Sequence, residues 1–170
     1  MSPPWTVPVR LHEIPCTVRL EPDATARARI ARDLGLESLP ELTAQLTLTP
    51  WMDGVEISGR FDALVEQICA VSLEAFTLTL RGEISVRAVP AGSPQAPDAQ
   101  GGEVDYDPEA PDPPDVLVGD TLDLASYLVE HLALEIDPFA RKPGAAFDYT
   151  PDVEPESPFA VLKALREPKP

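Results

Sequence analysis

The sequence predicts an α+β fold in which a twisted antiparallel β-sheet has two or three helices packed on one face. Apolar residues recur at every second position in three segments between residues 42 and 88, which is the pattern of antiparallel strands with one buried face. Three other segments, 24–34, 121–136 and 158–165, combine helix-capping residues with helical spacing of apolar residues. The chain of 170 residues has the length of a single domain, residues 1–170, with a sheet of about four or five strands.

The strands are predicted from alternation along the chain. Residues 6–14 alternate valine and leucine with polar neighbours and predict the first strand. In the three long segments that follow, the turn at Asp53-Gly54 is typical of a hairpin, and residues 71–75 return the second long strand into the third. The residues predicted to face the core are Leu42, Ala44, Leu46 and Leu48, then Val55, Ile57, Phe61 and Ala63, then Phe76, Leu78, Leu80, Ile84, Val86 and Ala88.

The first two helices have clear start signals. Asp23 is placed to cap a helix over residues 24–34, because its carboxylate can accept a hydrogen bond from a free N–H of the first turn. Asp120 is predicted to cap the helix over 121–136, which is amphipathic and ends before Pro138.

The third predicted helix, residues 158–165, begins with Ser157 as its cap and has Phe159, Leu162 and Leu165 about a turn apart. A helix of this length is not stable alone in water, so it must dock on another surface. That surface is either the protein's own sheet or a groove on a partner.

The charge is strongly negative and unevenly placed. The net charge is −16, and the segment between Arg87 and Arg141 contains twelve Asp and Glu residues but no Lys or Arg. Within it, residues 90–115 are rich in proline and acids, which predicts a flexible acidic loop with little apolar surface to bury. This loop is either a solvated insertion or an arm that binds a basic partner.

The composition also excludes several classes of protein. Nucleic-acid binding is normally driven by Lys and Arg, so an acidic chain of this kind is not expected to bind RNA without help. The sequence has neither an apolar run long enough to cross a membrane nor a signal peptide, which predicts a cytoplasmic protein. Cys16 and Cys69 are far apart in sequence and are predicted to be buried free thiols.

Residues with reactive side chains do not form a catalytic pattern. The two histidines, His12 and His131, belong to no known catalytic or metal-binding motif, and we predict no catalytic residue, no metal and no cofactor. The one tight basic cluster is Arg27, Arg29 and Arg32 on the first predicted helix. These arginines are either solvated surface charges or contacts to RNA phosphates.

Two segments resemble the YceD family, the large ribosomal RNA subunit accumulation proteins. In residues 66–76 a strand ends in a cysteine, and a short turn leads to the phenylalanine that opens the next strand; residues 157–165 are similar to the family's C-terminal Asn-Pro-Phe-Ala-Val-Leu signature. Between them, residues 123–138 match the family's leucine-rich helix and its Pro-containing turn. The motif residues, which the resemblance assigns to structure or to partner contact, are Cys69, Phe76, Pro158, Phe159, Val161 and Leu162.

The resemblance covers about residues 5–166 and departs from the family at one point. Many relatives have Cys-x-x-Cys in the first motif, where this chain has Ser72 as the second residue, so a zinc role is not implied here. The resemblance implies a bacterial, non-enzymatic factor that supports synthesis or processing of large-subunit ribosomal RNA. Its partners would be a ribosomal RNA precursor or a basic ribosomal or processing protein. The alternatives are an acidic, chaperone-like module for a basic ribosomal protein and a metal-dependent RNA hydrolase.

Overall fold

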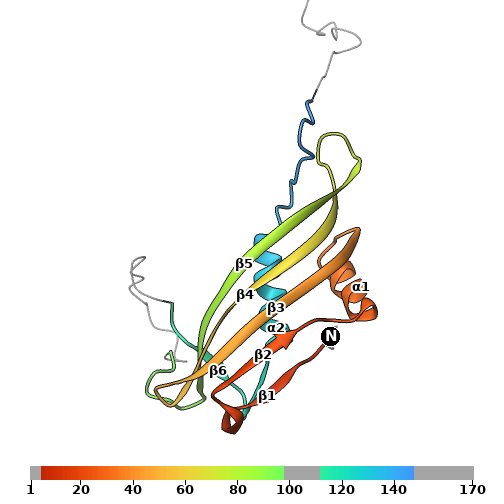
Figure 1. Cartoon of the computed structure of the whole chain (residues 1–170). Coiled ribbons are helices and arrows are strands. Elements are labelled where there is room, and N and C mark those ends of the chain that lie inside the picture. The colour runs from red at the N-terminus through yellow and green to blue at the C-terminus, as the bar shows by residue number, and fades with distance from the viewer. Residues whose placement is uncertain (1–4, 98–111, 148–170) are drawn as a thin grey trace, which may run out of the picture.

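A curved five-stranded sheet wrapped around one helix organises the protein (Figure 1), and the computed structural model describes residues 5–97 and 112–147. In chain order the elements are β1 (Pro8–Arg10), the 3-10 helix η1 (Leu11–Glu13), β2 (Cys16–Leu20), α1 (Ala24–Asp33), β3 (Ser38–Trp51), β4 (Gly54–Ile68), β5 (Ala75–Pro90), β6 (Asp115–Leu117), β7 (Thr121–Asp123) and α2 (Leu124–Glu135). The predicted α+β class is therefore confirmed.

The large sheet has the strand order β2-β3-β4-β5-β6. Neighbours from β2 to β5 are antiparallel, as predicted, and the three long strands pair over most of their length. The edge differs from the prediction, because β6 runs parallel to β5 and pairs only with residues 88–90. Strands β1 and β7 form a separate antiparallel pair.

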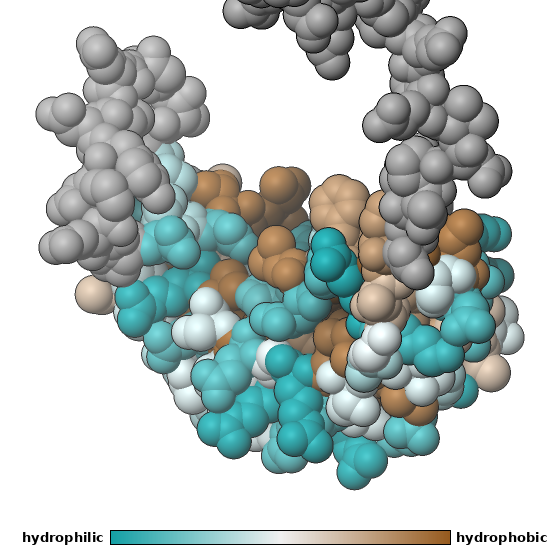
Figure 2. Space-filling view, turned by 90° about the horizontal axis from the view of Figure 1, so that it is seen from above, coloured by the Kyte–Doolittle hydropathy of each residue, from teal (hydrophilic) through white to brown (hydrophobic). Residues whose placement is uncertain are grey.

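The core lies on the concave side of the sheet. Every second residue of β3, β4 and β5 points into it, and α2 lies in the hollow with Leu124, Leu128 and Leu132 completely buried. Helix α1 adds Ile30 to the same core. Each completely buried leucine or isoleucine contributes about 1.5–3 kcal/mol relative to an exposed one, so the helices are held by their apolar faces. Figure 2 shows hydrophilic side chains over the convex side and hydrophobic ones gathered towards the hollow.

The hairpin between β3 and β4 turns at Met52 and Asp53, one position before the predicted Asp53-Gly54. Met52 has a φ of 52°, and Gly54 already pairs with Trp51 as the first residue of β4. Gly54 is needed for close packing, because a Cβ there would lie 2.1 Å from the carbonyl oxygen of Ala88.

The N-terminal region departs from the predicted strand over residues 6–14. Only Pro8–Arg10 of this segment forms a strand, and Leu11–Glu13 forms a 3-10 turn in which the Glu13 carboxylate accepts a hydrogen bond from the Arg10 backbone N–H at 2.8 Å. The Ile14-Pro15 peptide bond is cis, and the chain then enters β2, which alternation alone did not predict.

Helix α2 begins three residues later than predicted. Asp123, not Asp120, is its cap: the Asp123 carboxylate accepts hydrogen bonds from the N–H groups of Ala125 at 3.1 Å and Val7 at 2.7 Å. Residues 121–123 are instead drawn into β7 by pairing with β1. The predicted α1 at 24–34 is confirmed with its Asp23 cap. The predicted helix at 158–165 and most of the acidic loop lie outside the described residues.

We predict that Gly82→Ala destabilises the fold. A Cβ at this position of β5 would lie 2.4 Å from the ring of Phe61, which is buried in β4. Overpacking of this kind costs about 1–3 kcal/mol, which denaturant unfolding followed by circular dichroism would measure. Phe61→Leu removes the ring, so the double variant should lose less stability than the two single losses added together. Equal stability of Gly82→Ala and the wild type would contradict this packing.

Candidate functional site

An open groove runs between the edge of β5, β6 and α2. Its volume is about 510 Å³, and the residues that determine its chemistry are Arg87, Asp112, Asp115, Tyr127, Glu130 and His131. Helix α2 supplies the last three from one side, and the segment that enters β6 supplies the two aspartates from the other.

Three carboxylates of this groove have no cationic partner. Asp112, Asp115 and Glu130 take part in no ion pair within residues 5–97 and 112–147, and Glu130 accepts only the hydroxyl of Ser126 at 3.2 Å. Arg87 lies at the wall, but its Nε donates to Glu56 at 3.1 Å and its guanidinium stacks over the Trp51 ring at 5.0 Å. The groove therefore presents uncompensated negative charge.

Tyr127 and His131 add hydrogen-bonding groups to the lining of the groove. Burial raises the pKa of Tyr127, and the carboxylates of Asp115 and Glu130 raise it further, so the phenol keeps its proton and hydrogen-bonds to Asp115. The Nδ1 atom of His131 lies 2.9 Å from the carbonyl oxygen of Tyr127, so it is the donor in that hydrogen bond.

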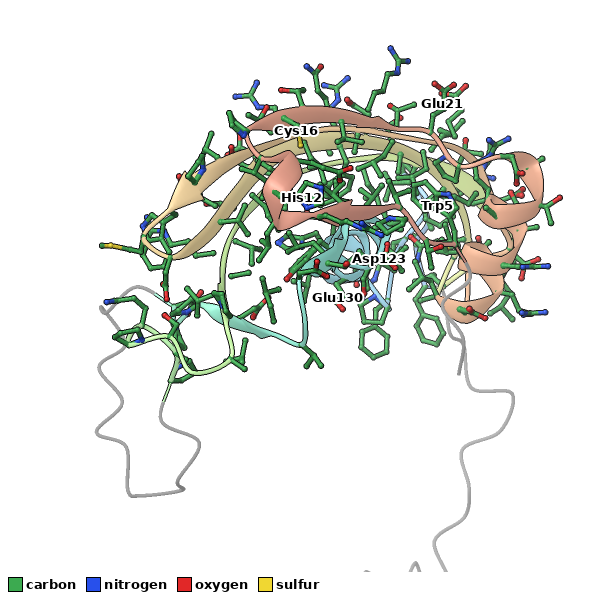
Figure 3. The ribbon with its side chains drawn as sticks, turned by 90° about the horizontal axis from the view of Figure 1, so that it is seen from below. Trp5, His12, Cys16, Glu21, Asp123 and Glu130 are labelled. Atoms are coloured by element: carbon green, nitrogen blue, oxygen red, sulfur yellow. The ribbon has the colours of Figure 1, made fainter. Side chains whose placement is uncertain are left out.

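The convex face of the sheet has a different charge pattern. Its ion pairs join neighbouring strands: Arg60 with Glu83 at 3.2 Å and Arg81 with Asp62 at 3.0 Å. Exposed pairs of this kind contribute little stability, but they cancel charge locally. Figure 3 shows Glu21 on this convex side, whereas Glu130 projects from α2 towards the open side of the arch. The two faces therefore offer different surfaces to a partner.

The structure places the motif residues Cys69 and Phe76 together. Both are buried, with Ala140, in a small second cluster under the β4–β5 turn. The Cys69 sulfur accepts hydrogen bonds from the backbone N–H groups of Val71 at 3.4 Å, Ser72 at 3.3 Å and Lys142 at 3.3 Å. Cys69 thus ties the turn to the segment that follows α2.

Hydrogen bonding makes Cys69 an acidic thiol. Its pKa falls from 9.0 to about 6, chiefly through a hydrogen bond from the Ser72 side chain and then through the backbone N–H groups, although burial opposes the thiolate. Cys16, which was predicted to be buried, is only partly buried because it lies on the edge strand β2, and both cysteines are free.

The three arginines of α1 do not form one surface. Arg27 donates from Nη1 to the carbonyl oxygen of Pro22 at 2.7 Å, and Arg32 lies 3.5 Å from Asp33. Arg29 is exposed one turn from Arg32 and about 160° around the helix from Arg27. Their contact with RNA stays a prediction. The motif residues Pro158, Phe159, Val161 and Leu162 lie outside the described residues.

The sequence did not predict the groove itself. The sequence contains a long interval without Lys or Arg, but nothing in it indicates that the seven acids within residues 112–137 share one surface. Asp115 and Glu130 meet only because β6 adds to the edge of β5 in parallel, and a three-residue strand gives no periodic signal.

In the described part of the chain, no three His, Cys, Asp or Glu residues lie together as a metal site would require, and neither helix has the length and apolarity to cross a membrane. No protein-family model, curated protein or solved structure matches the chain.

We predict that Cys69 stabilises the protein more at pH 9 than at pH 6. Since the folded pKa lies below the unfolded one, the stabilisation is complete above pH 9 and is lost as the pH falls through about 6. Unfolding free energies of the wild type and Cys69→Ala should therefore diverge as the pH rises, as denaturant titrations at several pH values would show. A difference that does not change with pH would contradict a thiolate at this position.

Proposed function

We propose that this protein is a cytoplasmic, non-enzymatic factor that supports accumulation of large-subunit ribosomal RNA by binding a basic ribosomal or processing protein. The observation that carries the proposal is the groove between β5, β6 and α2, whose carboxylates form no ion pair within residues 5–97 and 112–147. The resemblance of the two sequence motifs to the YceD family supports the link to ribosomal RNA.

Electrostatics gives this proposal its physical basis. Ribosomal proteins are generally basic, and an acidic surface speeds their association through long-range attraction. The attraction weakens with salt, because ions screen charges within about 8 Å at physiological ionic strength. Because Asp112, Asp115 and Glu130 are in no ion pair with the described Lys and Arg residues, a basic partner would not have to displace one of those residues to bind them. The proposal includes transient contact with an RNA precursor through Arg29, the exposed arginine of α1 that has no ion pair among the described residues.

The same groove also favours the chaperone-like alternative, in which the protein holds a free basic ribosomal protein before assembly. The two functions differ in the species that is bound. A factor acting on the precursor should co-sediment with ribosomal particles, whereas a chaperone should be found with the free protein.

We predict salt-sensitive binding that depends on the groove. The variant Asp115→Asn/Glu130→Gln should lose about tenfold in affinity for basic ribosomal proteins at low salt, measured by binding of the purified full-length protein to a fractionated set of these proteins. The control Glu37→Gln/Glu41→Gln removes the same charge from exposed positions near α1 and should bind as the wild type does. Equal binding by both double variants would refute the groove, and no binding by the wild type at low salt would refute the proposed function.

A further inference from the structure

We propose that the free edge of β5 receives an extended, lysine- or arginine-bearing segment of the partner as an added β-strand. This inference rests on the proposed function and specifies how the partner binds. Strand β5 pairs with β4 along nearly its whole length on one side, but with β6 over only three residues on the other.

The unpaired edge of β5 is long. Strand β5 pairs with β4 from residue 75 to residue 88, but with β6 only at residues 88–90. Within the described residues, no strand lies against the other side of residues 75–87, and Figure 1 shows β5 at the border of the sheet above β6. The backbone of this stretch therefore offers a row of N–H and C=O groups to an incoming strand.

The edge has little of the protection that folded proteins usually give to free strands. Residues 75–87 contain neither proline nor a bulge in their pairing with β4. The charged side chains Arg81 and Glu83 are held towards β4 by their ion pairs with Asp62 and Arg60. The exposed neighbours Thr77, Thr79 and Ser85 are small and compatible with strand pairing.

The acidic groove continues from this edge. Ser85 and Val86 of β5 line it together with Asp115 and Glu130. Alternate side chains of an added strand point to opposite faces, so those on the α2 side would reach the groove. A lysine or arginine suits this position, because its aliphatic stem can cover Val86 while its charge meets the two carboxylates.

The other candidates for this edge have the wrong charge. A second copy of the chain brings a further net charge of −16. Among the chain's own remaining segments, residues 98–111 contain five acids and no base, and residues 148–170 contain five acids and three bases. Charge complementarity therefore selects a basic partner.

Amide hydrogen exchange of the full-length protein, followed by NMR, tests this inference. The probe is a twelve-residue peptide that alternates Lys and Thr, and the matched control has Pro in place of each Thr. The control keeps every charge but disfavours strand pairing, because proline has no N–H and fixes φ near −65°. We expect the Lys-Thr peptide to slow exchange at alternate amides within residues 77–87 at least tenfold and the control to leave their exchange rates unchanged. Asp115→Asn/Glu130→Gln should weaken this protection, and Glu37→Gln/Glu41→Gln should not.

Three outcomes would overturn the inference. Binding of the Lys-Thr peptide without protection of β5 would show a groove that holds basic side chains without adding a strand, and would leave the proposed function intact. Edge amides that are already protected without peptide would identify another occupant: a second copy if protection rises with protein concentration, and the chain's own segment if it does not. Failure to bind both the peptide and the basic ribosomal proteins would refute the proposed function as well.

Discussion

Three very long strands each have one apolar face, and the fold has to bury that face along its whole length. Strands β3, β4 and β5 have 14–16 residues each and span about 50 Å, whereas the 12 residues of α2 cover only about 18 Å. The helix therefore protects the middle of the concave face. The segment after α2 continues along the hairpin and closes its far end, where Ala140 packs beside Cys69 and Phe76. The hydrogen bond from the Lys142 backbone N–H to the Cys69 sulfur holds the segment after α2 against this end of the hairpin.

The same arrangement separates charges. Cross-strand ion pairs cancel much of the charge on the convex face, while the segment with no Lys or Arg forms β6, β7 and α2 and lines the open side of the hollow. Among the described residues, Arg87 is the only Lys or Arg that lines the groove with Asp115 and Glu130, and it is paired with Glu56 and stacked on the Trp51 ring. The elements that bury the concave face of the sheet therefore also form an acidic surface beside the unpaired edge of β5.

Alternation predicted the long strands well, because each has one buried face and a period of two leaves little choice of register. The helix-capping residue Asp23 also predicted the start of α1. Capping residues did not predict the start of α2, where Asp120 and Asp123 are both suitable caps and only the tertiary pairing of Thr121 and Leu122 with β1 selects the second. The groove could not be predicted for the same reason: Asp115 and Glu130 are brought together by β6, which is held by three backbone pairs and the burial of Leu117, and three residues are too few to show a period.

We propose that the protein presents its groove, and not its convex face, to a basic partner. Zero-length carbodiimide cross-linking in cells tests it directly, since this reagent joins a carboxylate to a lysine only when the two are in contact. We expect cross-links from Asp112, Asp115 and Glu130 to lysines of a ribosomal or processing protein. Cross-links confined to convex-face acids such as Asp62 and Glu83 would contradict it.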